Sequence, residues 1–269
     1  KGMPRTAYII INWLAVILVI VVNALANTLP INGLNTGEVS ALYPNRFVPA
    51  AFTFNIWFFI YGLLILHASY STYILTNLKR SENVIGVLVY KLNPLYWITC
   101  ILNISWVLSW HYLQVGLSVV IMIALFFTLL RIFHLITIAD RDIQLGYMEH
   151  ISLETPFIIY FSWIAVALIA NITAWLVSLG WHPANETTWA CIMILVAACI
   201  GSALSVFWHR PAYTAVILWG LIGIYVRQSP DSSLIGTTTI IAGLLCVAAA
   251  LYGFWRKRKL LFRPSVQTE

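Results

Sequence analysis

The chain has 269 residues, of which 61% are hydrophobic and 9% are charged. Soluble domains carry roughly a quarter of charged residues, so this composition excludes an ordinary soluble protein. The formal net charge is +6, but the basic residues are scattered over loops and one terminal cluster, which indicates topology signals and not a nucleic-acid surface.

Apolar segments of about twenty residues recur along the chain, and each can cross a bilayer as a helix. We predict an all-α polytopic membrane bundle with eight spans: Tyr8–Asn27, Ala50–Leu75, Leu95–Tyr112, Gly116–Ile138, Pro156–Gly180, Thr188–Trp208, Ala212–Val226 and Leu234–Trp255. The seventh is shorter than the roughly twenty residues that a span needs. It therefore tilts little, crosses thinned bilayer, or extends through Trp208 with a kink at Pro211.

The distribution of basic residues between the spans predicts the orientation. If the N-terminus lies in the cytoplasm, the outer loops hold only Arg46 and Arg227, and all other basic loop and tail residues lie inside. This asymmetry follows the positive-inside rule. We expect both termini to be cytoplasmic and the protein to lie in the cell (inner) membrane.

The loop between the first two spans, Thr28–Pro49, is long for a connection inside a bundle and contains two glycines and three prolines, counting Pro49. Long ordered loops are often functional, so we interpret it as a lid over the outer mouth of the bundle. The alternative is a connector without a function. We call this segment the lid loop.

Aromatic residues crowd the start of the second span, directly after the lid loop. Phe54, Trp57 and Tyr61 lie there, and the last two are four residues apart on one helical face. The predicted topology brings the end of the third span to the same level of the membrane, with Trp106, Trp110 and the polar Asn103. These residues are therefore expected to converge on a pocket for a flat apolar ligand.

Each of these residues also has a structural interpretation. Tryptophan and tyrosine are common at membrane interfaces, and an asparagine inside a span can serve as a hydrogen bond between helices. For Asn12, Asn23 and Asn171 we favour the interhelical bond. For Asn103 the interhelical bond and a ligand contact remain equal alternatives.

The sequence offers no metal centre and no catalytic group. The four cysteines lie inside apolar segments without zinc-ligand spacing, and the histidines form no site with three or four ligands. His67 is the most unusual of them, because an ionisable group inside a bilayer is a functional candidate. We favour a neutral, hydrogen-bonded structural histidine.

Three sets of residues follow a known pattern: Pro49, Trp57 and Tyr61 in the second span, Asn103 and Trp106 in the third, and Pro156, Tyr160 and Ser162 in the fifth. In this pattern the chain resembles the TspO/MBR family, the tryptophan-rich sensory proteins related to the mitochondrial translocator protein. The resemblance covers about residues 1–180. The last three spans lie outside the usual length of that family.

Several positions depart from the family pattern. Val48 replaces the first proline of the pair, Phe157 replaces a tyrosine, and Tyr160 replaces a tryptophan. The asparagine usual near the end of the fifth helix is Leu168 here, with Asn171 one turn further on. The cholesterol-recognition sequence proposed for animal members has no counterpart. These departures bear more on the ligand than on the fold.

The resemblance implies a five-helix ligand-binding bundle over residues 1–180, with a pocket closed by the lid loop, and a three-helix extension with a basic cytoplasmic tail over residues 181–269. The implied ligand is a tetrapyrrole such as protoporphyrin IX. The residues expected to line its pocket are Phe54, Trp57, Tyr61, Asn103, Trp106, Trp110, Tyr160 and Trp163. The last two depend on the resemblance for their place in this pocket.

Three functions follow from these observations. The first is a membrane receptor or carrier for a planar hydrophobic ligand. The alternatives are an enzyme that degrades porphyrins, for which no acid–base pair or nucleophile is found, and a small-solute transporter, for which no internal repeat is found. A retinal protein is excluded, because no lysine lies between Lys91 and Lys257. The expected partners are the lipid bilayer, the planar ligand and a second copy in a homodimer.

Overall fold

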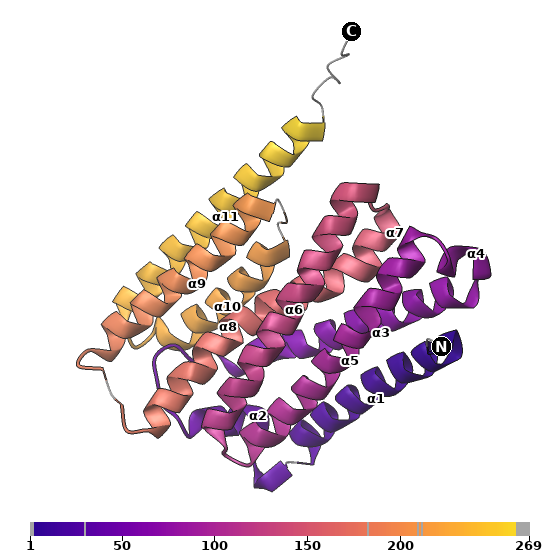
Figure 1. The fold of residues 1–269 in the computed structure, drawn as a ribbon. Helices are drawn as coiled ribbons and strands as arrows, with labels where there is room; N and C mark the ends of the chain where they lie inside the picture. The colour runs from indigo at the N-terminus through magenta and orange to yellow at the C-terminus, as the bar shows by residue number, and fades with distance from the viewer. Residues whose placement is uncertain (1–2, 30, 182, 209, 211, 262–269) are drawn as a thin grey trace. The chain divides into compact units, whose positions relative to one another are not determined.

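The computed structural model describes residues 3–29, 31–181, 183–208, 210 and 212–261, which are predominantly helical and contain no strand (Figure 1). The predicted all-α class is confirmed. The chain divides into two compact units. The first unit is Lys1–Asn45 with Phe54–His182, and the second unit is Arg46–Thr53 with Pro183–Glu269.

Five long helices build the first unit: α1 (Arg5–Thr28), α3 (Ile56–Thr76), α5 (Val84–His111), α6 (Val115–Ile143) and α8 (Thr155–Ser178). Short elements connect them: the 3-10 turn η1 (Ile31–Gly33), α2 (Thr36–Ala41), α4 (Leu78–Ser81), α7 (Tyr147–Glu149) and the π-turn η3 (His150–Glu154). A further 3-10 turn, η2 (Ala51–Asn55), leads into α3. The described residues of this unit therefore contain five membrane-length helices.

Seven of the described helices are long and apolar enough to cross a membrane, so the chain is a multi-pass membrane protein. They are the five long helices of the first unit together with α9 (Glu186–Trp208) and α11 (Ser233–Leu261). The remaining long helix, α10 (Ala212–Gln228), has 17 residues. At a rise of 1.5 Å per residue it is about 25 Å long, which is slightly shorter than the roughly 30 Å of a bilayer core.

The third span begins earlier than predicted. It was expected from Leu95, but α5 begins at Val84 and continues through Pro94. The side chain of Asn83 caps this start by accepting a hydrogen bond of 3.0 Å from the Gly86 amide. Proline is tolerated inside membrane helices, so it does not end α5 where the sequence analysis placed the boundary.

Helix α8 forms the centre of the first unit, in contact with α3 and α6. Every side chain from Pro156 to Val166 is buried, so this stretch is enclosed on all sides. Helix α1 contacts α3 and α5, and only three of its apolar side chains are buried: Val16, Val19 and Ala26. The aromatic residues of this stretch of α8 therefore lie in the core of the bundle, whereas Trp175 nearer the end of the helix is exposed.

Asn12 links three helices of the first unit, as predicted for an interhelical amide. Its Nδ2 donates to Ser71 Oγ of α3 at 2.9 Å, and its Oδ1 accepts from Trp97 Nε1 of α5 at 2.5 Å. The side chain is fully buried. Both ends of the amide are satisfied, so the bonds hold α1 against its neighbours.

The second unit contains α9, α10 and α11, which contact one another. Small residues permit close approach: a Cβ on Gly201 would lie 2.6 Å from Ile217 of α10, and a Cβ on Gly253 would lie 2.4 Å from the Ser205 carbonyl oxygen of α9. The kink expected at Pro211 lies outside the described residues. The predicted basic tail is described only as far as α11 reaches, and residues 262–269 are outside that part of the chain.

The end of the lid loop belongs to the second unit and not to the first, where the sequence analysis placed it. The Ala50 amide donates to the Gly223 carbonyl oxygen at 2.9 Å, Trp219 Nε1 donates to the Thr53 carbonyl oxygen at 2.8 Å, and Gln228 Nε2 donates to the Val48 carbonyl oxygen at 3.2 Å. All three partners are on α10. Helix α10 therefore holds the segment Arg46–Thr53, which leads directly into the aromatic start of α3.

Candidate functional site

Trp57 is the centre of a cluster of aromatic rings inside the first unit. Its ring stacks on Tyr61, with centroids 5.7 Å apart, and on Trp106, with centroids 6.0 Å apart. The rings of Tyr160 and Trp163 meet it edge-on at 5.8 and 6.3 Å. Rings from α3, α5 and α8 are thus brought together, including the two on α8 whose place depended on the family resemblance.

Two further rings extend this group. Trp110 stacks on Trp106 at 6.1 Å, and Phe54 meets Trp163 edge-on at 6.3 Å. We call the seven rings the aromatic cluster: Phe54, Trp57, Tyr61, Trp106, Trp110, Tyr160 and Trp163. All of the predicted aromatic site residues are members.

Helical spacing explains why these rings meet. Trp57 and Tyr61 are four residues apart on α3, and Tyr160 and Trp163 are three apart on α8, so each pair lies on one helical face. On α5, Trp106 follows Asn103 by three residues and precedes Trp110 by four. Each of the three helices therefore presents one aromatic stripe to the centre of the bundle.

The aromatic cluster is almost completely shielded from solvent and from lipid. Phe54 is half-buried, and every other predicted site residue is at most 9% exposed. Asn103 is fully buried. Hydrogen bonds and charges in such surroundings are screened little, so an unpaired polar atom is costly and a paired one is strong.

Asn103 connects the aromatic cluster to α1. Its Nδ2 donates to the Tyr160 hydroxyl at 2.9 Å, and its Oδ1 accepts from Asn23 Nδ2 at 2.8 Å. Asn103 therefore bonds two other helices, and its amide is already engaged on both sides. Of the two roles left open for this residue, the interhelical bond is the one present in the structure.

A second amide bonds the other end of the aromatic cluster. Asn171 Oδ1 accepts from Trp106 Nε1 at 2.9 Å, and Asn171 Nδ2 donates to Ser118 Oγ of α6, also at 2.9 Å. Asn171 thus supplies an asparagine contact to this cluster although the aligned position, Leu168, has none. The sequence analysis missed Ser118, whose only signal is a small polar residue on an apolar helix.

Two polar atoms of the aromatic cluster lack such a partner. Trp163 Nε1 is buried and donates no hydrogen bond within the described part of the chain. The Tyr61 hydroxyl lies near Asn103 but makes no hydrogen bond of ordinary geometry with any residue that the structure describes. Each such group costs about 1–3 kcal/mol when left unpaired, so a ligand with acceptor atoms would gain two partners here.

The first part of the lid loop covers the Trp110 end of the aromatic cluster. Trp110 Nε1 donates to the Thr36 carbonyl oxygen at 3.2 Å, and the ring of Tyr43 lies 6.1 Å from that of Trp110. Next to it, His111 Nε2 lies 3.1 Å from Thr36 Oγ1. Asn35 fixes α2 with a capping box that includes Glu38, so the covering segment is an ordered turn of helix.

His67 lies in the half of the bundle toward the α7 end of the first unit. It is fully buried, with its ring 4.9 Å from that of Tyr96 and 4.8 Å from that of Phe157. Its nitrogens lie near Asn93 and the Ser152 backbone, but among the described residues they make no hydrogen bond of ordinary geometry, unlike the hydrogen-bonded histidine that the sequence analysis favoured. Ring packing therefore holds this histidine in place.

No group of three or more His, Cys, Asp or Glu side chains that could hold a metal ion occurs among the described residues. The site therefore consists of aromatic faces, amides and hydroxyl groups. Such an arrangement can bind and orient an apolar molecule with a few acceptor atoms.

Comparison with known proteins identifies the family of this chain. No curated protein and no solved structure shows significant similarity to it. The family model described as TSPO-like protein matches residues 9–252, which include the whole aromatic cluster and continue through α9 and α10 into α11. A match over this much of the sequence means that the chain belongs to the TSPO-like protein family.

Proposed function

We propose that this protein is a membrane receptor or carrier for a planar hydrophobic molecule, that a tetrapyrrole such as a porphyrin is its ligand, and that the aromatic cluster is the binding site. The main observation behind this is the stack of Trp57 between Tyr61 and Trp106, next to the unpaired N–H of Trp163. Family membership supports the fold of such a receptor, and the ligand rests on the chemistry of the site.

The ring geometry suits a flat ligand. Trp57 is within 20° of parallel to Tyr61 and within 29° of parallel to Trp106. A flat ligand between two rings needs about 7 Å between their planes, which is twice the ordinary contact distance of about 3.5 Å. A small separation of α3 from α5 would open that space, and the ligand would replace one ring stack with two.

Polar atoms at the site would orient the ligand. Trp163 Nε1 and the Tyr61 hydroxyl can donate hydrogen bonds to acceptor atoms such as the carboxylates of a porphyrin. Asn103 is held by Asn23 and Tyr160, so we assign it the role of fixing the Tyr160 ring and not a direct contact. Entry would require the residues 31–43 to move away from Trp110, which gives this part of the lid loop its function.

Titration with protoporphyrin IX tests this proposal. We expect the Soret band to shift and tryptophan fluorescence to be quenched on binding to the full-length protein. Trp57→Leu and Trp106→Leu should each weaken binding about fivefold, because an aromatic pair contributes about 1 kcal/mol. Trp163→Phe retains the ring and removes the N–H, so a loss of affinity in that variant would assign the ligand's acceptor to this donor.

Trp255→Leu is the matched control, because Trp255 is 51% exposed and lies in the second unit. Its affinity should equal that of the intact protein. If the Trp57 and Trp106 variants keep their helical content and bind protoporphyrin IX as tightly as the intact protein does, the aromatic cluster is not the binding site. Chromatography of the porphyrin after incubation distinguishes a carrier, which returns it unchanged, from an enzyme that degrades it.

A further inference from the structure

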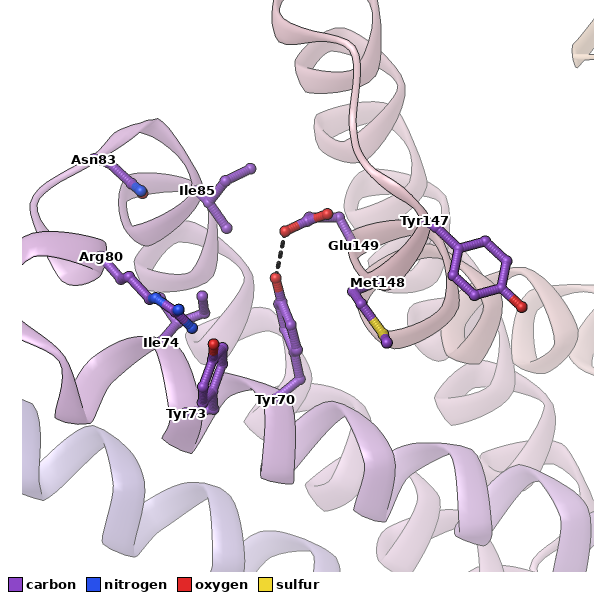
Figure 2. A pocket seen from close by; sticks show the side chains of 9 residues that line it. All are labelled: Tyr70, Tyr73, Ile74, Arg80, Asn83, Ile85, Tyr147, Met148 and Glu149. Carbon is purple, nitrogen blue, oxygen red and sulfur yellow. Dashed lines mark hydrogen bonds between the residues drawn. The ribbon is translucent and has the colours of Figure 1, made fainter.

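A hollow lies in the first unit, in the half of the bundle away from the aromatic cluster. Its volume is about 430 Å³, and it is formed by the end of α3, the start of α5, the turn containing α4, and α7. Figure 2 shows its nine lining residues, among them Tyr70, Tyr73, Arg80 and Glu149. We call it the Arg80 pocket.

Arg80 provides the positive charge of the Arg80 pocket. Its guanidinium carbon lies 4.1 Å from the centroid of the Tyr73 ring, and Figure 2 shows the group lying over that ring. Within the described part of the chain, no carboxylate oxygen lies within 4 Å of it. A guanidinium stacked in this way keeps its N–H edge available for an anion and is well suited to a phosphate.

Glu149 provides a negative charge at another part of the same pocket. One of its carboxylate oxygens accepts a hydrogen bond of 2.5 Å from the Tyr70 hydroxyl. This bond fixes the carboxylate while leaving it further acceptor positions. The rings of Tyr70 and Tyr73 have centroids 6.0 Å apart and lie between the two charges in Figure 2. Aromatic faces beside a carboxylate are a favourable place for an ammonium group.

The chemistry of the ligand follows from this separation of charge. An anion would be attracted by Arg80 but repelled by Glu149. A cation would be attracted by Glu149 but repelled by Arg80. A molecule that carries both charges satisfies the two residues together. We propose that the Arg80 pocket binds a zwitterion with a phosphate and a primary ammonium, and that this zwitterion is the head group of an ethanolamine phospholipid.

The position of the pocket favours a lipid over a soluble molecule. It lies where α3 ends and α5 begins, which is the level of a membrane–water interface for helices of this length. Apolar side chains around it are exposed, including Leu78 at 61% and Met148 at 62%. Acyl chains could lie against them while the head group occupies the pocket. A quaternary choline cannot donate hydrogen bonds to Glu149, so the primary ammonium is preferred.

Native mass spectrometry of the purified full-length protein can test this directly. The probes are phosphatidylethanolamine, phosphatidylcholine and phosphatidylglycerol with identical acyl chains, and soluble glycerophosphoethanolamine. We expect phosphatidylethanolamine to be retained best. Arg80→Gln should reduce its retention about tenfold, as expected for losing a charge-assisted bond to phosphate. Glu149→Gln keeps an acceptor for Tyr70 and removes the charge, so it should shift the preference toward phosphatidylglycerol.

Arg141→Gln and Asp142→Asn are matched controls, because these residues are exposed, pair with each other at 3.1 Å, and do not line the pocket. Both should retain phosphatidylethanolamine like the intact protein. Circular dichroism checks that the variants are folded. Equal retention of all three lipids, or retention unchanged by both pocket substitutions, would overturn the proposal. Retention of glycerophosphoethanolamine as strong as that of the lipid would overturn the lipid source and leave a soluble zwitterion as the ligand.

Discussion

The two fully enclosed tyrosines of the first unit, Tyr96 and Tyr160, differ in one respect. The Tyr160 hydroxyl accepts a hydrogen bond of 2.9 Å from Asn103, whereas the Tyr96 hydroxyl lies near Cys100 and makes no hydrogen bond of ordinary geometry with any described residue. Both side chains are at most 1% exposed. Comparing the two residues therefore isolates the contribution of one hydrogen bond to stability, because the burial of the two side chains is nearly the same.

We predict different outcomes for the two tyrosine-to-phenylalanine substitutions. Tyr160→Phe should lower the free energy of unfolding by about 0.5–1.5 kcal/mol, because it leaves Asn103 Nδ2 without its acceptor. Tyr96→Phe should leave stability unchanged or raise it, because it removes an unpaired buried oxygen. Unfolding in mixed detergent micelles measures both. A larger loss in Tyr96→Phe than in Tyr160→Phe would contradict this account of the network.

Sequence reasoning reached the aromatic cluster because the information is local to each helix. The spacings of Trp57 with Tyr61 and of Asn103 with Trp106 and Trp110 define faces that any helix would present. The Asn103 bond to Asn23 could not be read in the same way, because the partners are 80 residues apart and many asparagines could serve. The pairing depends on the relative rotation of α1 and α5, which packing decides.

At the scale of elements, the contact between the lid loop and α10 was also not predictable. Gly223 makes it feasible, because a Cβ there would lie 2.0 Å from Thr53 Oγ1 and 3.0 Å from Pro49 Cβ. In the sequence, Gly223 is one of several glycines in apolar helices and carries no signal of its own. Its role appears only once the segment Arg46–Thr53 is placed on α10. The contact joins α10 to the segment that leads into α3.

Gly223→Ala should therefore release this segment. We expect faster hydrogen exchange at the Ala50 amide, which donates to the Gly223 carbonyl oxygen, and a loss of stability of about 1–3 kcal/mol from overpacking. Gly243→Ala is the control, because its Cβ would meet only Leu218 at an ordinary 3.6 Å. Unchanged exchange at Ala50 in the Gly223 variant would mean that the segment is held independently of α10.

At the scale of the whole molecule, hydropathy predicted the membrane class and the all-α fold, since both follow from the apolar length of the segments. It was less successful with boundaries. Helix α5 begins eleven residues before the predicted Leu95, because a cap at Asn83 and a tolerated Pro94 outweigh the usual effect of proline. Helix α10 has 17 residues, so its length alone does not decide whether it crosses the bilayer.

The side of the membrane on which the loop after α10 lies tests whether this helix crosses the bilayer. We propose that α10 crosses the membrane, which places Asp231 outside, Asp142 in the cytoplasm and both termini in the cytoplasm, in agreement with the distribution of basic residues. Both aspartates are exposed in the structure, so Asp231→Cys and Asp142→Cys form a matched pair. The background should carry Cys199→Ser, because Cys199 is the exposed native thiol among the described residues.

A membrane-impermeant maleimide added to intact cells should label Asp231→Cys and leave Asp142→Cys unlabelled until the cells are permeabilised. If α10 lay at one surface instead, the loop after it would return to the cytoplasmic side, and both cysteines would need permeabilisation. Labelling of Asp142→Cys in intact cells would show that the orientation of the whole protein is the opposite of the one proposed. Labelling of Asp231→Cys alone would place the Arg80 pocket at the cytoplasmic leaflet, because Asp142 lies at the end of α6, on the same side as the α7 turn that lines the pocket. The lipids that could reach the pocket are then those of the inner leaflet.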